Sequence, residues 1–140
     1  MKFLFIILPS LFLLVACSIS KDHELIEKFE EKNNLFQEIA SKIKDCENRY
    51  GLDAQTKIKD KSCKTITEEL NIKYISTRSW QYYFTIKSSF NYSKGYVYSR
   101  KKPKPLFNSL DVIPNNLALG EYGYKHLNKN WYIFIANYND

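Results

Sequence analysis

Few side chains in this sequence are of the types that carry out catalysis. A nucleophilic enzyme needs Ser, Cys or Thr beside a base, together with a third group that orients the base. The chain has two histidines, His23 and His126. We interpret His23 as a solvated residue of the N-terminal region. We interpret His126, at the end of an expected strand, as a residue for surface or cross-strand packing.

Phosphate loops, paired carboxylates and metal clusters find equally little support. The four glycines (Gly51, Gly95, Gly120 and Gly123) lie too far apart for a glycine-rich phosphate loop. A glycosidase in the C-terminal half would have to use Asp111 and Glu121, because Asp140 is the last residue. Zinc usually takes four ligands, and no further Cys or His stands near Cys46 or Cys63. We therefore expect a protein that is not an enzyme and uses no cofactor or metal.

The first 17 residues form a targeting pattern. Lys2 precedes an apolar run of 14 residues, Phe3–Ala16, which is shorter than the roughly 20 residues of a membrane-spanning helix. A charged start followed by a short apolar core is typical of a secretory signal peptide. The segment Leu14–Cys17 (Leu-Val-Ala-Cys) resembles the lipobox of bacterial lipoproteins. This resemblance implies a signal peptide at residues 1–16, cleavage before Cys17 and a lipid anchor, including palmitate-type acyl chains, on Cys17.

The same resemblance implies a location. The residue after the cysteine is Ser18 rather than Asp. In the sorting pattern of enterobacterial lipoproteins this favours the outer membrane over the inner one, with the domain facing the periplasm. We expect a lipidated tether at residues 17–21 and a single domain at 22–140, which is long enough for one hydrophobic core. Export argues against nucleic acid as a partner.

Lipidation also changes the cysteine count. With Cys17 acylated, Cys46 and Cys63 remain as one pair in an oxidising compartment. A disulfide between them would close a loop of about 17 residues, worth about 3 kcal/mol. The alternative is two buried free thiols.

Hydrophobic periodicity predicts an α+β fold. Apolar residues recur at helical spacing between Asp22 and Tyr50, with a lapse at Asn33 and Asn34, which indicates one helix with a weak middle or two in sequence. Residues 52–64 are expected to form a loop, and Thr65 to cap a short helix at 66–70. Strands are expected at 72–78, 80–87, 95–99, 121–126 and 131–137, and a short helix or turn at 106–113. We predict an N-terminal amphipathic helix (or two) packed on a four- to five-stranded antiparallel sheet. Both faces of the last strand are apolar, which predicts a central or covered strand.

Charge and aromatic residues concentrate in the second half of the chain. Residues 71–140 hold 16 of the 22 aromatic residues and carry 10 Lys and Arg against 3 Asp and Glu. Within this half, Pro103 and Pro105 break up a basic run that consists of Arg100, Lys101, Lys102 and Lys104. The run suggests a candidate binding site, and its alternative interpretation is a solvated, extended linker.

Two functions fit these features. The first is a tethered domain that binds an envelope or periplasmic protein, as an assembly factor or a toxin-neutralising protein, because Tyr, Trp and Arg dominate protein interfaces. The second is a module that binds an anionic glycan or lipid of the envelope. Two segments, Lys94–Ser99 and Asn130–Phe134, resemble parts of small envelope lipoproteins without an assigned activity.

Overall fold

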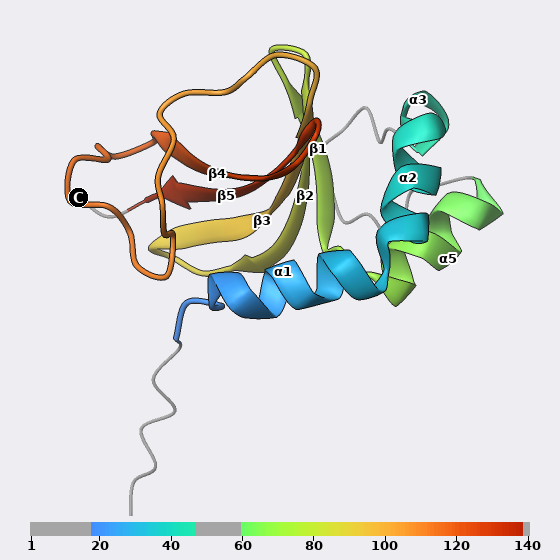
Figure 1. The fold of residues 1–140 in the computed structure, drawn as a ribbon, viewed down its shortest axis with the longest axis horizontal. Helices are drawn as coiled ribbons and strands as arrows, with labels where there is room; N and C mark the ends of the chain where they lie inside the picture. Colours follow the sequence, from blue (N-terminus) through green and yellow to red (C-terminus); the bar gives the residue numbers. More distant parts are fainter. Residues whose placement is uncertain (1–17, 47–59, 139–140) are drawn as a thin grey trace, which may run out of the picture.

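The computed structural model describes residues 18–46 and 60–138 (Figure 1). The expected signal peptide, residues 1–16, and the expected lipidation site, Cys17, lie outside the described residues. The helices are α1 (Asp22–Glu31), α2 (Asn33–Ser41), α3 (Ile43–Cys46) and α5 (Lys61–Glu69). The strands are β1 (Tyr74–Arg78), β2 (Gln81–Ser88), β3 (Tyr92–Ser99), β4 (Tyr122–Asn128) and β5 (Trp131–Asn137).

The strands form one five-stranded antiparallel sheet in the order β1-β2-β3-β5-β4. The α+β class with a five-stranded antiparallel sheet is therefore confirmed. β5 lies between β3 and β4, and all of its residues are buried. Its two apolar faces thus reflect a central strand that is covered on both sides, as predicted.

The N-terminal helical region is divided into short helices. α1 ends at Glu31, α2 begins at Asn33, and a second break at Lys42 separates α2 from α3. The break at Lys32 agrees with the alternative of two helices in sequence, and the break at Lys42, which adds a third helix, was not expected. Their buried side chains continue one apolar stripe across the breaks: Leu25, Phe29, Phe36, Ile39 and Ile43. Among the described residues, no helix is both long and apolar enough to cross a membrane.

α5 begins earlier than predicted. The Asp60 carboxylate accepts hydrogen bonds from the backbone N–H groups of Ser62 and Cys63, both at 2.9 Å, and so caps the helix in front of Lys61. Thr65, the expected cap, lies inside the helix, where its hydroxyl donates to the Lys61 carbonyl. The prediction was wrong because an Asp in a lysine-rich segment was interpreted as part of a loop, although Asp is among the best N-capping residues.

The main hydrophobic core lies between the helices and one face of the sheet. The Phe36 ring is 4.6 Å from the Tyr96 ring and 5.2 Å from the Trp131 ring, measured between centroids. Phe29 contacts the same two rings at 6.3 and 5.9 Å. The Tyr96 hydroxyl donates to the Leu25 carbonyl at 2.8 Å. These contacts join residues of α1 and α2 to residues of β3 and β5.

A second apolar cluster occupies the opposite face of the sheet. The hydroxyl oxygens of Tyr83, on β2, and Tyr124, on β4, are 2.6 Å apart. β3 and β5 separate these strands, so in a flat sheet their backbones would be about 14 Å apart. The sheet is curved (Figure 1), and this cluster on its second face also contains Val97 and Phe134.

A β-bulge contributes to the curl. The register between β2 and β3 shifts between Thr85 and Lys87, opposite Gly95. A Cβ atom at Gly95 would overlap the Phe84 carbonyl oxygen. Gly95 therefore permits the close approach of the two backbones at the bulge. The bulge in turn increases the local twist of the strand and bends the sheet.

The segment between β3 and β4, where a short helix or turn was expected at 106–113, contains no helix. Leu106 forms an isolated parallel bridge with Tyr124 on the edge strand β4. The Phe107 N–H donates to the Tyr124 carbonyl at 2.7 Å, and the Tyr124 N–H donates to the Pro105 carbonyl at 3.1 Å. These bonds pair backbone groups of Tyr124 that would otherwise be unpaired at the edge of the sheet. A helix at this position would have left those groups without these partners.

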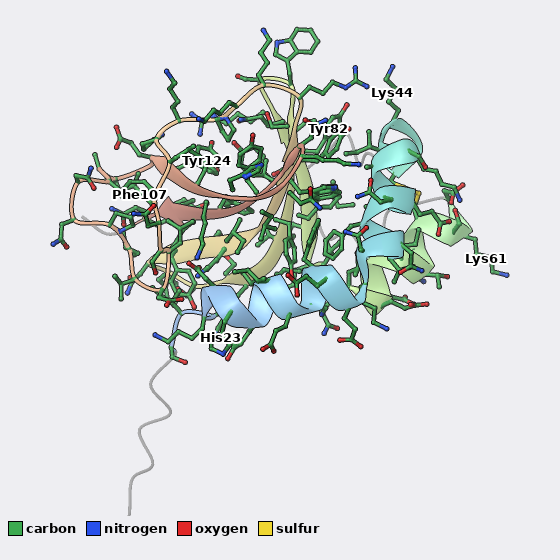
Figure 2. All side chains as sticks on the ribbon, viewed as in Figure 1. His23, Lys44, Lys61, Tyr82, Phe107 and Tyr124 are labelled. Atoms are coloured by element: carbon green, nitrogen blue, oxygen red, sulfur yellow. A yellow bond between two sulfur atoms is a disulfide. The ribbon has the colours of Figure 1, made fainter. Side chains whose placement is uncertain are left out.

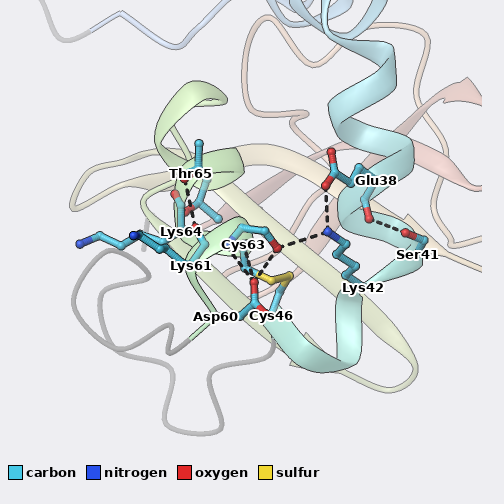
Figure 3. Close-up of a disulfide and its surroundings, with 11 residues drawn as sticks. Glu38, Ser41, Lys42, Cys46, Asp60, Lys61, Cys63, Lys64 and Thr65 are labelled. Carbon is cyan, nitrogen blue, oxygen red and sulfur yellow. Dashed lines mark hydrogen bonds and ion pairs between the residues drawn. A yellow bond between two sulfur atoms is a disulfide. The ribbon is translucent and has the colours of Figure 1, made fainter.

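Cys46 and Cys63 form a disulfide, as predicted, and it joins α3 to α5 (Figure 3). Beside it, the Lys42 ammonium group bonds to the Glu38 carboxylate at 2.9 Å and to the Ser62 hydroxyl at 3.2 Å. The disulfide and Lys42 together fix α3 against its neighbouring helices.

Candidate binding site

A hollow of about 320 Å³ lies where the β1–β2 turn, the end of β3 and the short helix α3 meet. We call it the Trp80 cavity. Its lining residues are Ile43, Lys44, Trp80, Tyr82, Tyr98, Arg100 and Lys101. Three aromatic rings and three cationic side chains thus share one cavity, and among the residues that the structure describes none that lines it is acidic. The volume is at the lower end of the range for small-ligand pockets.

Trp80 is presented to solvent by a strained turn. Ser79 and Trp80 connect β1 to β2, and both have positive φ angles, 46° and 71°. A two-residue hairpin turn with two positive φ angles normally favours Asn-Gly or Gly-Gly. A bulky side chain in this conformation is uncommon, and strained residues of this kind gather at functional sites. The Trp80 side chain is nevertheless 83% exposed, so packing within the domain does not explain its presence.

A chain of hydrogen bonds positions the loop that carries Arg100 and Lys101, two of the three cationic residues of the cavity. The Tyr83 hydroxyl donates to Gln81 Oε1 at 2.6 Å. Since a hydroxyl has one proton, Tyr124 must be the donor to Tyr83. Gln81 Nε2 donates to Ser99 Oγ at 3.4 Å, and Ser99 Oγ donates to the Lys101 carbonyl at 2.5 Å. The curled face of the sheet is thereby connected to the backbone of the cationic loop.

The opposite wall of the cavity belongs to α3. Ile43 is buried against the core, and Lys44 is exposed. Figure 2 shows Lys44 at the tip of α3 and Tyr82 at the adjacent end of the sheet. Because α3 is only 4 residues long, it depends on the Cys46–Cys63 disulfide to keep this wall in place.

The structure divides the predicted basic site. Arg100 and Lys101 line the Trp80 cavity, whereas Lys102 is exposed and outside that lining. Lys104 lines a separate hollow of about 480 Å³ with Arg78, Tyr122 and Glu121. Pro103, between the two sites, is buried. The four basic residues therefore do not line one cavity, and buried Pro103 separates Lys104 from Arg100 and Lys101 along the chain.

Sequence reasoning did not connect Lys44, Trp80, Tyr82 and Tyr98 to the basic run. Tyr82 and Tyr98 are paired across β2 and β3, which places them side by side on one face. One sequence signal was available. Trp80 occupies the position where a turn between two strands must fall, and a large aromatic residue is unusual there.

A buried ionic cluster forms the other prominent polar feature. The fully buried Lys94 ammonium group bonds to Asp22 Oδ1 at 2.7 Å and to the carbonyls of Ser20 and Leu110, both at 2.6 Å. Asp22 Oδ2 accepts from Lys125 Nζ at 3.0 Å and from the Leu110 N–H at 2.8 Å. Each of the three N–H groups of Lys94 therefore has an acceptor. We call this cluster of Asp22, Lys94 and Lys125 the clasp, because it links the start of α1 to the sheet.

Asp22 and Lys94 of this clasp shift each other's pKa. Burial alone would raise the pKa of Asp22, but the bonds from Leu110, Lys94 and Lys125 lower it by more, so its pKa lies below the usual 3.8. Burial lowers the pKa of Lys94, and Asp22 only partly opposes that shift. Periodicity could not reveal this clasp, because its members are far apart in the sequence.

The two histidines and the two carboxylates that were considered for catalysis lie in separate surroundings. His23 is exposed on the first turn of α1, far from Lys44 in Figure 2. His126 packs across the strands against the Tyr132 ring at 5.0 Å. The carboxylates of Asp111 and Glu121 accept backbone hydrogen bonds from Asp22 and Ala118. Within residues 18–46 and 60–138, no three His, Cys, Asp or Glu side chains are placed to hold a metal ion.

Comparison with protein-family models gives no match for this chain, and no curated protein or solved structure matches it.

Proposed function

We propose that this protein is a bacterial envelope lipoprotein whose domain binds an acidic segment of a protein partner in the Trp80 cavity. The signal peptide is residues 1–16, and lipid on Cys17 holds the mature chain to a membrane. Ser18 after the cysteine favours the outer membrane, with the domain in the periplasm. The lipobox-like segment Leu14–Cys17 supports the anchoring part of this proposal.

One observation carries the binding part: Trp80, 83% exposed on a strained turn, stands beside cationic side chains of Lys44, Arg100 and Lys101. Trp, Tyr and Arg are the residues that most often dominate the energy of protein interfaces. Three cations line the described part of the cavity, and they favour a partner that presents Asp or Glu. The domain acts by binding and not by catalysis, as an assembly factor or as a toxin-neutralising protein.

The arrangement of the fold suits this role. In Figure 1 the β1–β2 turn and α3 lie at the top of the view, whereas the chain reaches α1 from below. The Trp80 cavity therefore faces away from the anchored end. This requires α1 and α2 to remain packed on the sheet, which the contacts of Phe29 and Phe36 with Trp131 support.

An anionic glycan is the second candidate occupant. The cavity of about 320 Å³ could hold a sugar unit against Trp80 or Tyr82, with its acidic group near Arg100. A lipid of the anchoring membrane fits less well, because the cavity lies at the far end of the domain.

A photo-crosslinking amino acid at position 80 tests the proposal in intact cells. Adducts that a protease removes support a protein partner, and adducts that resist protease but yield to a polysaccharide hydrolase support the glycan. The matched control is the same amino acid at Thr65, which is exposed on α5 away from the cavity. Equal adducts at both positions would contradict a site at the Trp80 cavity.

Neighbouring lysines provide a sharper comparison with the captured partner. Trp80→Ala should weaken binding about 30-fold, which corresponds to a loss of about 2 kcal/mol at a hot spot. Lys101→Ala should weaken binding several-fold, and this effect should shrink as salt is added. Lys102→Ala removes the same charge one residue away, outside the cavity lining, and should have little effect. Equal losses for Lys101→Ala and Lys102→Ala would indicate general electrostatic attraction instead of a defined site.

A further inference from the structure

The four residues after Cys17 dock on the domain. The Ser18 carbonyl accepts hydrogen bonds from Lys87 Nζ at 2.5 Å and from the Tyr92 hydroxyl at 3.3 Å. The Ser20 carbonyl accepts from Lys94 Nζ at 2.6 Å. Ile19 packs against the main core, and Lys21 caps α1. Within the expected tether, residues 17–21, the backbone of Ser18 and Ser20 is therefore bonded to side chains of the sheet.

This docking limits how far the domain can stand from a lipid on Cys17. Five free residues would span about 17 Å, whereas Cys17 alone adds only about 4 Å beyond the docked Ser18. The surface around Ser18 would then lie at the level of the lipid headgroups. A surface at that level should expose apolar and aromatic side chains.

Exposed apolar side chains gather at this end of the domain. Of the seven large apolar side chains that are exposed among the described residues, four belong to segments that converge here: Phe90, Val112, Leu119 and Tyr138. Phe90 is 99% exposed, Val112 66%, Leu119 56% and Tyr138 40%. Exposed apolar residues that cluster in this way indicate a contact surface.

Hydrogen bonds place these four residues near the docked segment. Phe90 lies at the tip of the hairpin whose strands contribute Lys87 and Tyr92, the two residues that bind Ser18. The Tyr138 N–H donates to the Asn91 carbonyl at 2.8 Å, next to Phe90.

The other two residues are tied to the same end. Val112 follows Asp111, whose carboxylate accepts from the Asp22 N–H at 2.7 Å. Leu119 lies beside Gly120, which donates to the Asn137 carbonyl at 2.7 Å. In Figure 1 the start of α1 and the end of β5 both lie at the left of the view, away from α3.

From these placements we infer that the end of the domain carrying Phe90, Val112, Leu119 and Tyr138 lies on the bilayer that holds Cys17, with the Phe90 ring in its interface. Lys87, which binds the Ser18 carbonyl and lies three residues before Phe90, can meet lipid phosphates, and Tyr138 is of a type enriched at membrane interfaces. This inference rests on the proposed lipidation of Cys17. It adds an orientation, in which the Trp80 cavity points away from the membrane.

Tryptophan fluorescence of the lipidated protein in liposomes of phosphatidylethanolamine and phosphatidylglycerol tests this orientation. The probe is Phe90→Trp in a Trp80→Phe background, and Trp131 is buried in every variant. On reconstitution, the emission from position 90 should shift to shorter wavelengths, and lipids brominated on their acyl chains should quench most of it. The protein with its native Trp80 and Phe90 is the matched control, and brominated lipids should leave its Trp80 emission unchanged.

The outcomes separate the two proposals. Protein that floats with the liposomes while position 90 is unquenched would overturn the membrane-facing surface and leave the anchor intact. Protein purified from the envelope that fails to float would overturn the anchor and this inference with it. Position 90 shielded from aqueous iodide but untouched by brominated lipid would indicate a protein on this surface, and would also overturn it.

A second variant tests the docked segment. Lys87→Ala removes the 2.5 Å bond to Ser18 and should lengthen the free tether, so lipid quenching at position 90 should fall although the protein still floats. Quenching that is unchanged in Lys87→Ala would show that docking does not set the orientation.

Discussion

The Arg78 guanidinium lies over the Tyr122 ring, 4.8 Å from its centroid. Arg78 ends β1 and Tyr122 begins β4, and these two strands are the opposite edges of the sheet. In a flat sheet the edges would be about 19 Å apart. The contact therefore shows how strongly the sheet curls, and Tyr83, 5.1 Å from the Tyr122 ring, fills the space between the edges.

Removing this contact should loosen the curled sheet. A cation–π contact of this kind contributes about 1 kcal/mol, so Arg78→Ala should lower the free energy of unfolding by about that amount. Urea titration followed by circular dichroism measures the change. Lys73→Ala, an exposed cation just before β1, is the control and should have little effect. Equal midpoints for the two variants would mean that Arg78 does not hold the edges together.

Loss of the disulfide should affect both stability and binding. Cys46→Ser with Cys63→Ser removes a link across 17 residues and should cost about 3 kcal/mol of unfolding free energy. Because α3 forms one wall of the Trp80 cavity, binding of the crosslinked partner should also weaken under conditions where the variant is still folded. Calorimetry and titration with that partner measure the two effects. Unchanged binding by the folded variant would show that α3 is not part of the binding site.

Asp22 should make the domain sensitive to acid. Its folded pKa lies below the usual 3.8, so its ionised form contributes stability above that pH, and this contribution is lost as the pH falls toward the folded pKa. Asp22→Asn should cost about 3 kcal/mol or more at neutral pH, because Lys94 is left buried without its counter-ion.

The double variant Asp22→Asn/Lys94→Met removes both buried charges. It should recover part of that stability and lose less on acidification than the wild type, as measured by urea titrations at a series of pH values. Glu24→Gln, an exposed carboxyl on the same helix, is the control. A wild-type acid dependence that survives in the double variant would assign it to other carboxyls.

Lipidation can be tested at its attachment point. Metabolic labelling with a clickable palmitate should mark the wild type and not Cys17→Ser, because the thiol is the acceptor that the lipobox-like segment implies. The variant should also keep its uncleaved signal peptide, which a mass measurement detects. Equal labelling of the two proteins would contradict the lipoprotein assignment.

The sequence by itself was sufficient for most of the secondary structure. Alternation in residues 80–87 predicted β2 to within a residue at each end, because a half-buried strand leaves a period of two in the sequence. The pairing of Cys46 with Cys63 followed from counting. The start of α5 was missed because a single capping residue, Asp60, decided it.

Only the tertiary structure decided which residues share a site. Arg100 and Lys104 are neighbours in the chain, but they line different cavities, and buried Pro103 lies between them. Lys44 and Trp80 come from distant segments and meet because a disulfide fixes α3 and a hairpin turn presents the indole. Periodicity reports which face of an element is buried, whereas the curl of the sheet depends on long-range contacts such as Arg78 with Tyr122. Those contacts join residues that are far apart in the sequence, and no local pattern predicts them.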